Sequence, residues 1–160
     1  MPAAQIIERL MSVDVLVHTW DLARAVGLAR VVQRRQAEQL PVDLAQHHAR
    51  VGHLLKSRAA ENHILYNRLT DEIGGRASYE LEFPNGGVAV VMGNLIAQSS
   101  TTENPHVISF GVEGATWARQ ALYLVNNTLV DQRPGGGIWL RVTPPQAEVM
   151  LANNLLVGAP

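Results

Sequence analysis

Short runs of apolar residues recur through the second part of the chain, and four of them end in asparagine. The runs HILYN, AVVMGN, LYLVNN and VMLANN place Asn67, Asn94, Asn127 and Asn154 at spacings of 27, 33 and 27 residues. Further strand-like runs (ASYELEF, HVISFG and GIWLRVT) lie between turns rich in Gly, Pro and Asn. Each period therefore holds two or three short strands and leaves no room for a helix, except at EGATWARQ.

A repeat made only of short strands and turns predicts a parallel β-solenoid, in which each period forms one coil. Equivalent strands of successive coils then lie about 4.8 Å apart, so like residues stack above one another. An asparagine at a strand end tolerates the left-handed conformation. Its side-chain amide can donate a hydrogen bond to one neighbouring coil and accept one from the other. We therefore predict that the four asparagines form a ladder inside the stack.

The pattern before the repeat is helical. One face of a helix over about residues 3–26 would carry the apolar residues Ile6, Leu10, Val13, Val17 and Trp20, which are spaced by 4, 3, 4 and 3. Gly27 is a suitable stop for this helix. We expect a second helix at ARVVQRRQAEQ, residues 29–39, and a third short helix or a loop at VDLAQHHARVG.

Composition changes near the same point. Residues 1–60 contain no asparagine and two glycines, whereas residues 61–160 contain all nine asparagines and eleven of the thirteen glycines. We therefore divide the chain into a helical N-terminal segment, residues 1–49, and β-coils, residues 50–160. The predicted fold class is mainly β: a short solenoid of about four coils with an N-terminal α-helical cap or appendage.

Charge and cysteine content exclude several classes of partner and of chemistry. The net charge of −1 gives no basic surface for nucleic acid or an anionic membrane, so we expect neither as a partner. The absence of cysteine excludes disulfides and thiolate chemistry. The N-terminus lacks a basic region followed by an apolar core, which predicts no signal peptide and a cytoplasmic location.

The stretch from HLLKSRAAENHILYNRLTDE to VMLANNLLVG, about residues 50–160, resembles the C-terminal coils of right-handed parallel β-helix proteins of the pectate-lyase-like superfamily. This resemblance implies a right-handed coil. Many such proteins bind or cleave polysaccharides, others are structural, and many are exported. The fold alone therefore does not assign a reaction.

Lys56, the only lysine, lies two residues from Arg58. If HLLKSRA is a strand, both side chains share one face, about 7 Å apart. Elimination of uronate polymers needs a cation to neutralise the carboxylate and a base to remove the adjacent carbon-bound proton. We predict that this face binds acidic polysaccharide, with Lys56 and Arg58 as the catalytic pair if it cleaves by β-elimination. Arg76, Tyr66 and Tyr79 are the predicted substrate-binding residues.

A second interpretation of Lys56 and Arg58 is a basic row that supports acidic side chains of the next coil. KSRA also resembles the lysine-containing strand of alginate lyases in the superfamily, which implies a calcium site of Asn and Glu. The candidates by residue type are Glu61, Glu80, Glu82, Asn67 and Asn94. The sequence leaves open whether the protein is an enzyme.

ERLMSVDVLVHTWDLARAVG, near the N-terminus, is similar to a motif of the DinB-like, mycothiol-dependent maleylpyruvate isomerase family. The resemblance implies a divalent transition metal held by Asp14 and His18, which lie four residues apart on one helix face. The alternative function is therefore a fragment of a metal-dependent thiol transferase or isomerase. Asp14 and His18 also fit a solvated helix face.

A third alternative is a structural or interaction module without an active site. Repeat stacks need caps, because an uncovered terminal coil exposes its core and its unpaired strand edge. The C-terminal edge near LLVGAP has no cap in the sequence pattern. We therefore expect self-association through this edge.

Overall fold

A computed structural model describes residues 30–34, 39–42, 46–47 and 52–158 of the chain. The described residues form strands and turns and include no helix. The predicted helix over residues 3–26 lies outside them, as do Asp14 and His18.

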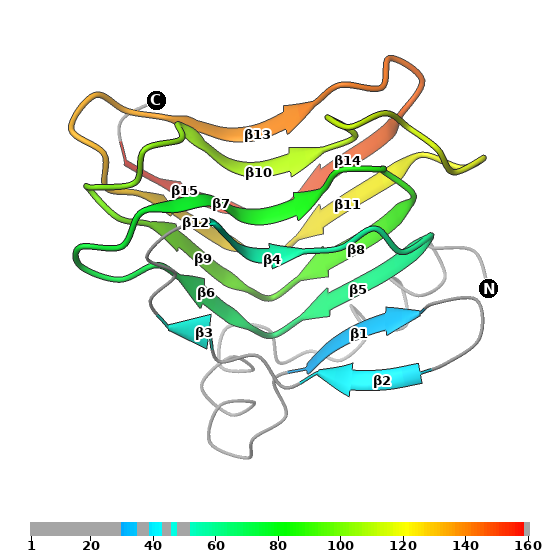
Figure 1. The fold of residues 1–160 in the computed structure, drawn as a ribbon, viewed down its shortest axis with the longest axis horizontal. Helices are drawn as coiled ribbons and strands as arrows, with labels where there is room; N and C mark the ends of the chain where they lie inside the picture. The colour runs from blue at the N-terminus through cyan, green and yellow to red at the C-terminus, as the bar shows by residue number, and fades with distance from the viewer. Residues whose placement is uncertain (1–29, 35–38, 43–45, 48–51, 159–160) are drawn as a thin grey trace.

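Three sheets contain all the described strands (Figure 1). Sheet C consists of β4 (Gly52–Lys56), β7 (Ala77–Phe83), β10 (His106–Phe110) and β13 (Ile138–Val142). Sheet A consists of β5 (Glu61–Leu65), β8 (Val88–Met92), β11 (Ala121–Val125) and β14 (Glu148–Ala152), with β1 (Arg30–Arg34) and β2 (Gln39–Val42) at its edge. Sheet B consists of β3 (Gln46–His47), β6 (Arg68–Thr70), β9 (Leu95–Gln98), β12 (Thr128–Asp131) and β15 (Leu155–Val157).

Each strand from β4 to β12 pairs in parallel with the strand three places further along the chain. The chain therefore visits sheets C, A and B in turn, and β4, β7, β10 and β13 rise in sequence order (Figure 1). The predicted mainly β architecture with parallel pairing is confirmed, and this order is compatible with a β-helix-like solenoid.

The core consists of columns of apolar side chains that repeat from one pass of the chain to the next. The strand registers align Leu55, Leu81, Ile108 and Leu140 in sheet C, Ile64, Val91, Leu124 and Leu151 in sheet A, and Leu69, Ile96, Leu129 and Leu156 in sheet B. The members of these columns before β13 are 0–3% exposed. Each buried Leu or Ile stabilises the fold by about 1.5–3 kcal/mol relative to an exposed one.

The asparagines stack at the turn between sheets A and B. The Nδ2 groups of Asn67, Asn94 and Asn127 donate to the Oδ1 atom of the next asparagine over 3.2, 2.9 and 3.0 Å. The residue before each asparagine has the left-handed backbone: Tyr66, Gly93, Asn126 and Asn153 have φ values between 52° and 68°. The left-handed conformation that asparagine tolerates is therefore adopted by the residue before each ladder asparagine.

The residue before the ladder asparagine is a glycine in one pass only, Gly93, and its contacts explain this choice. It has a φ of 68°, and a Cβ atom there would lie 2.5 Å from the ring of Tyr66 in the preceding pass. Glycine leaves room for this aromatic ring, which packs across the turn.

Two further helix predictions are corrected. Residues 29–39 contain β1 and part of β2, which pair antiparallel with each other, and β1 also pairs antiparallel with β5. The open edge of β5 offers hydrogen bonds that outweigh the helical propensity of this segment. EGATWARQ is a loop, because Glu113 N donates to Pro84 O and Thr116 N donates to Asn85 O in the turn of the preceding pass.

Candidate functional site

The strands of sheet C do not alternate regularly between inside and outside. In β4, Leu54 and Leu55 are both 3% exposed and belong to the core, whereas His53 and Lys56 on either side are about a quarter exposed. The corresponding pairs in β7 and β10, Glu80–Leu81 and Val107–Ile108, are 0% exposed, and Trp139 and Leu140 of β13 pack partly buried against the same core. A strand with two successive inward residues bends at that point, as happens at a bulge.

This bend creates two columns on the outer face of sheet C. The first column consists of His53, Tyr79, His106 and Ile138, and the second consists of Lys56, Glu82, Ser109 and Arg141. The columns lie three residues apart along the strands, which is about 10 Å. A ligand on this face would therefore contact aromatic rings on one side and charged groups on the other.

The first column is an aromatic stack. The rings of His53 and Tyr79 lie 5.3 Å apart at an interplanar angle of 17°, and the rings of Tyr79 and His106 lie 6.2 Å apart at 38°. Burial lowers the pKa of both histidines, and the cations Arg141 and Arg133 lower that of His106 further. Both imidazoles are therefore neutral near pH 7, and the stack is uncharged.

The second column contains a network of ion pairs. Lys56 Nζ lies 2.9 Å from Glu82 Oε2 and 2.6 Å from Glu113 Oε1, and Arg58 pairs with the other oxygen of Glu113. His53 Nε2 lies 3.4 Å from the same oxygen of Glu82, so the two columns meet at this carboxylate. Glu82 is 2% exposed, whereas Glu113 is 42% exposed.

These contacts fix the protonation of Lys56. Burial alone would lower its pKa, but the hydrogen bonds to Glu113 and Glu82 outweigh burial and raise the pKa above its usual value. The hydrogen bonds from Lys56 and Arg58 lower the pKa of Glu113. Lys56 is therefore a permanent cation near neutral pH and is poorly suited to removing a proton.

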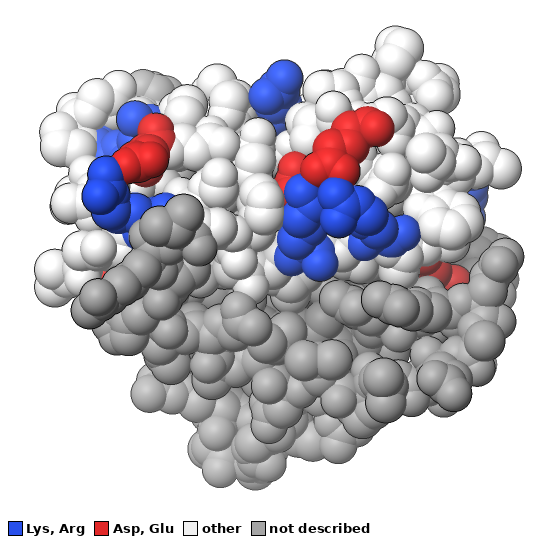
Figure 2. Space-filling model, viewed as in Figure 1, with Lys and Arg blue, Asp and Glu red and all other residues white. Residues whose placement is uncertain are grey.

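Of the other predicted site residues, Tyr79 lies next to the ion-pair network, whereas Arg76 and Tyr66 do not. Tyr79 lies beside His53 in the aromatic stack, whereas Arg76 precedes β7 and pairs with Glu103 at the far end of the strand. Figure 2 shows charged side chains gathered in two main groups on this face, with an uncharged band between them. Tyr66 lies in the turn between sheets A and B, and the structure does not bring it to this face.

Arg58 lies beyond the end of β4, so HLLKSRA is not a strand over its whole length. The side chains of Lys56 and Arg58 nevertheless converge, because both pair with Glu113. Glu113 lies on the loop after β10, two passes further along the chain. Sequence reasoning missed His53, His106 and Glu113. The repeated pattern of an aromatic residue, two buried residues and a polar residue in β4, β7 and β10 could have identified the two histidines once the coils were aligned.

The candidate calcium ligands do not come together. Asn67 and Asn94 belong to the ladder, Glu61 pairs with His63 on sheet A, Glu80 lies in the core and Glu82 pairs with Lys56. Within the described part of the chain, no group of three or more His, Asp or Glu side chains is close enough to hold a metal ion. The metal site at Asp14 and His18 stays a prediction.

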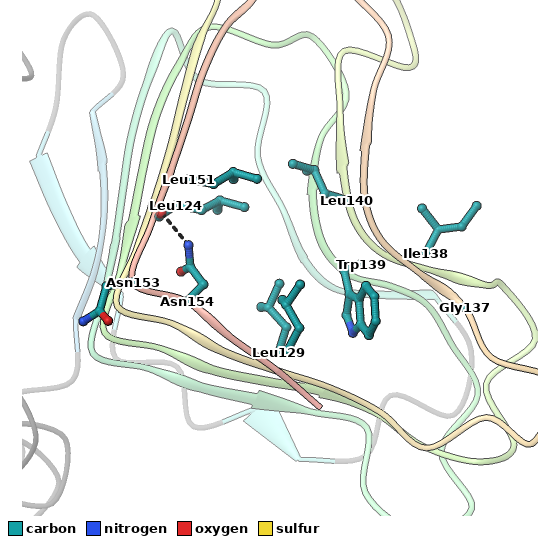
Figure 3. A pocket seen from close by; sticks show the side chains of 10 residues that line it. Leu124, Leu129, Gly137, Ile138, Trp139, Leu140, Leu151, Asn153 and Asn154 are labelled. Atoms are coloured by element: carbon teal, nitrogen blue, oxygen red, sulfur yellow. Dashed lines mark hydrogen bonds between the residues drawn. The ribbon is translucent and has the colours of Figure 1, made fainter. Parts of the chain in front are cut away.

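A separate cavity of about 560 Å³ opens at the end of the stack formed by β13, β14 and β15 (Figure 3). Leu124 and Leu129 form its floor, and Trp139, Leu140 and Leu151 point into it, whereas Ile138 points away. It is lined mainly by apolar side chains of the core columns. Among the residues that the structure describes, the cavity is thus the open end of the hydrophobic core.

The described residues contain no helix of the length and hydrophobicity needed to cross a membrane. The chain matches no family model, no curated protein and no solved structure among those compared with it. The candidate function therefore rests on the chain's own residues.

Proposed function

We propose that the outer face of sheet C binds an acidic polysaccharide, and that the chain coils as a right-handed parallel β-helix of the pectate-lyase-like kind. The observation that carries this proposal is the stack of His53, Tyr79 and His106 next to the cations Lys56 and Arg58. Flat rings provide apolar surface for the faces of sugar rings. The cations provide charge-assisted hydrogen bonds for the carboxylates.

Glu113 occupies the position that a uronate carboxylate would take. It accepts hydrogen bonds from Lys56 and Arg58, yet it is 42% exposed and lies on a loop. A carboxylate on the ligand offers the same acceptor oxygens and can displace it. Glu82 is 2% exposed and remains with Lys56. Glu113 is therefore a competitor for the ligand, and Glu82 holds Lys56 in position.

Cleavage by β-elimination is the second candidate function, and the lowered pKa of His53 supports it. The neutral imidazole would take the proton from the carbon next to the carboxylate. The electron pair of that C–H bond would form the C=C bond as the glycosidic C–O bond breaks, and the departing oxygen would take up a proton. Lys56, as a cation, would neutralise the carboxylate instead of acting as the base.

Calorimetric titration with oligogalacturonate tests binding, and a neutral oligosaccharide of similar length serves as the control ligand. We expect Tyr79→Ala to weaken the affinity about fivefold, because stacking on an aromatic ring contributes on the order of 1 kcal/mol. Glu113→Gln should tighten binding several-fold, since it removes the competing carboxylate. Lys56→Gln should weaken it.

Glu61→Gln is the matched control for Glu113→Gln. Glu61 is 41% exposed and its carboxylate also pairs with a basic side chain, but it lies on sheet A. The control variant should leave the affinity unchanged. Equal effects of the two variants, or no binding by a folded wild-type chain, would rule out the proposed face.

The same mixtures, followed by the ultraviolet absorbance of unsaturated uronate, distinguish cleavage from binding. Absorbance that rises with wild type and not with His53→Gln, while binding persists, supports elimination. Binding without any rise identifies a binding module. A chain that binds no uronate but retains a stoichiometric transition metal, lost in His18→Ala, supports the metal-dependent alternative.

A further inference from the structure

The outer face of sheet A carries a second apolar cluster, separate from the core. Its buried members are Val90, Met92, Ala121, Tyr123 and Val125 on β8 and β11, and each is between 0 and 4% exposed. Partly buried neighbours extend the cluster to β5 and β14. Because these side chains point away from the core columns of the same strands, they form the outside of the stack.

An outer sheet face that faced water would carry polar residues at alternate positions. β5 has this pattern, since Glu61 and His63 pair on its outer face. β8 and β11, in contrast, read VAVVM and ALYLV and are apolar on both sides. Strands with two apolar faces are typical of sheets that are covered on both sides.

Sheet A itself does not provide that cover. Every described member of the cluster comes from β5, β8, β11, β14 or the turn after β5. The members form one layer, and the burial of five of them to 4% exposure or less requires a second apolar surface on top of this layer. Of the described residues outside the sheet, Arg119 reaches this face, where it bonds the hydroxyl of Tyr123.

We propose that residues 3–26 cover this face as an amphipathic helix. The segment has the required apolar stripe, namely Ile6, Leu10, Val13, Val17 and Trp20. As a helix it would be about 36 Å long, which exceeds the span of four strands spaced about 4.8 Å apart.

Chain connectivity supports this occupant. β1 begins at Arg30, which pairs with Leu65 of β5, and Leu65 borders the apolar cluster. The chain before β1 therefore reaches the described fold at this sheet. Residues 27–29 are the link from the predicted helix to β1, and Gly27 within it permits a sharp change of direction.

The docking surface does not depend on the proposed sugar-binding face. Sheet A carries the apolar cluster and sheet C carries the aromatic stack, so a variant of one leaves the other intact. Loss of uronate binding would therefore say nothing against the helix, and loss of the helix contact would say nothing against uronate binding.

Disulfide cross-linking tests the proposal in the full-length chain, which has no cysteine of its own. Val17→Cys lies on the apolar stripe and is combined in turn with Val90→Cys and Val125→Cys. Mild oxidation should produce an intramolecular disulfide in at least one pair, seen as faster migration on a non-reducing gel and an intact mass lower by two hydrogens. Thr19→Cys, about 160° from Val17 around the helix, is the control and should give little cross-link with either partner.

Equal cross-linking of Val17→Cys and Thr19→Cys would overturn the proposal, and so would cross-linking of neither. Predominantly intermolecular disulfides would identify a second copy as the occupant and also overturn it. Hydrogen exchange of the unmodified chain provides a readout that needs no variant. We expect slow exchange of the amides between residues 8 and 20, and exchange at the rate of an unstructured peptide would contradict the helix.

Discussion

Glu80 is an acidic residue in an apolar part of the core. It is 0% exposed, it projects inward from β7 between Leu54 and Val107 of the neighbouring strands, and neither of its carboxyl oxygens has a hydrogen-bond partner. Burial, with a smaller contribution from the charge of Asp71, raises its pKa to about 9. Glu80 is therefore protonated in the folded protein at neutral pH, when an exposed glutamate would be ionised.

This protonation predicts a stability that falls as pH rises. Between the usual glutamate pKa and about 9, the folded state retains a proton that the unfolded state has released. The free energy of unfolding therefore decreases with pH over this window, on the order of 1 kcal/mol per pH unit. Glu80→Gln removes this titration and keeps the shape of the side chain.

Thermal unfolding of wild type and Glu80→Gln from pH 4 to pH 9 measures the effect. The two melting temperatures should agree near pH 4, and the variant should become progressively more stable as pH rises. Comparison between the two proteins cancels the titration of other groups. A difference that stays constant over the whole range would show that Glu80 does not titrate in this way.

At the scale of elements, the asparagine ladder joins the successive passes of the chain. Asn94 is 2% exposed and makes four hydrogen bonds through its side chain. Its Oδ1 atom accepts from the backbone and the side chain of Asn67, and its Nδ2 group donates to Ile64 O and to Asn127 Oδ1. The ladder thus satisfies backbone groups that the sharp turn leaves unpaired.

Asn94→Ala should destabilise the protein by on the order of 3 kcal/mol, because it leaves several buried donors and acceptors unsatisfied. Asn153→Gly is the control. Asn153 is exposed, donates one hydrogen bond to Asn126, and has a φ of 52° that glycine adopts without strain. Urea unfolding should show a clearly larger loss for Asn94→Ala. Losses of similar size would contradict a stabilising role for the ladder.

The periodicity of the asparagines was sufficient to predict parallel strands at the level of elements. It could not predict the bend in sheet C, because the pattern of two inward residues between outward ones matches neither the period of a regular strand nor that of a helix. His53 and His106 were missed for this reason, since their place on the outer face depends on the bend. The helix predicted at residues 29–39 was wrong because its alternative partner, the edge of β5, is distant in the sequence.

At the scale of the whole molecule, one end of the stack differs from the rest of its surface. Among the described residues, seven large apolar side chains are exposed, and six of them belong to β13, β14 and β15: Ile138, Val149, Leu151, Leu155, Leu156 and Val157. These three strands are paired on one side only within the described structure. The end therefore combines an apolar cavity with three open strand edges.

We propose a second copy of the chain as the partner for this end. Two copies related by a two-fold axis present the same edge to each other, so a strand can pair antiparallel with its counterpart while the two cavities close over a shared apolar interior. The open edge also explains why a monomer would be prone to association, since unpaired strand edges are templates for pairing. We therefore propose that the chain dimerises end to end.

Sedimentation equilibrium over a range of concentrations tests this dimer. Leu151→Glu and Leu156→Glu place a charge in the cavity and should shift the chain to monomers, because a buried charge without a partner is costly. Ile73→Glu is the matched control, since Ile73 is 96% exposed but lies in the turn between β6 and β7. If Ile73→Glu disrupts association as strongly, or if wild type stays monomeric at all concentrations, the open end is not the interface. Dimerisation lost only with the two cavity variants would place the second copy over the uncovered core.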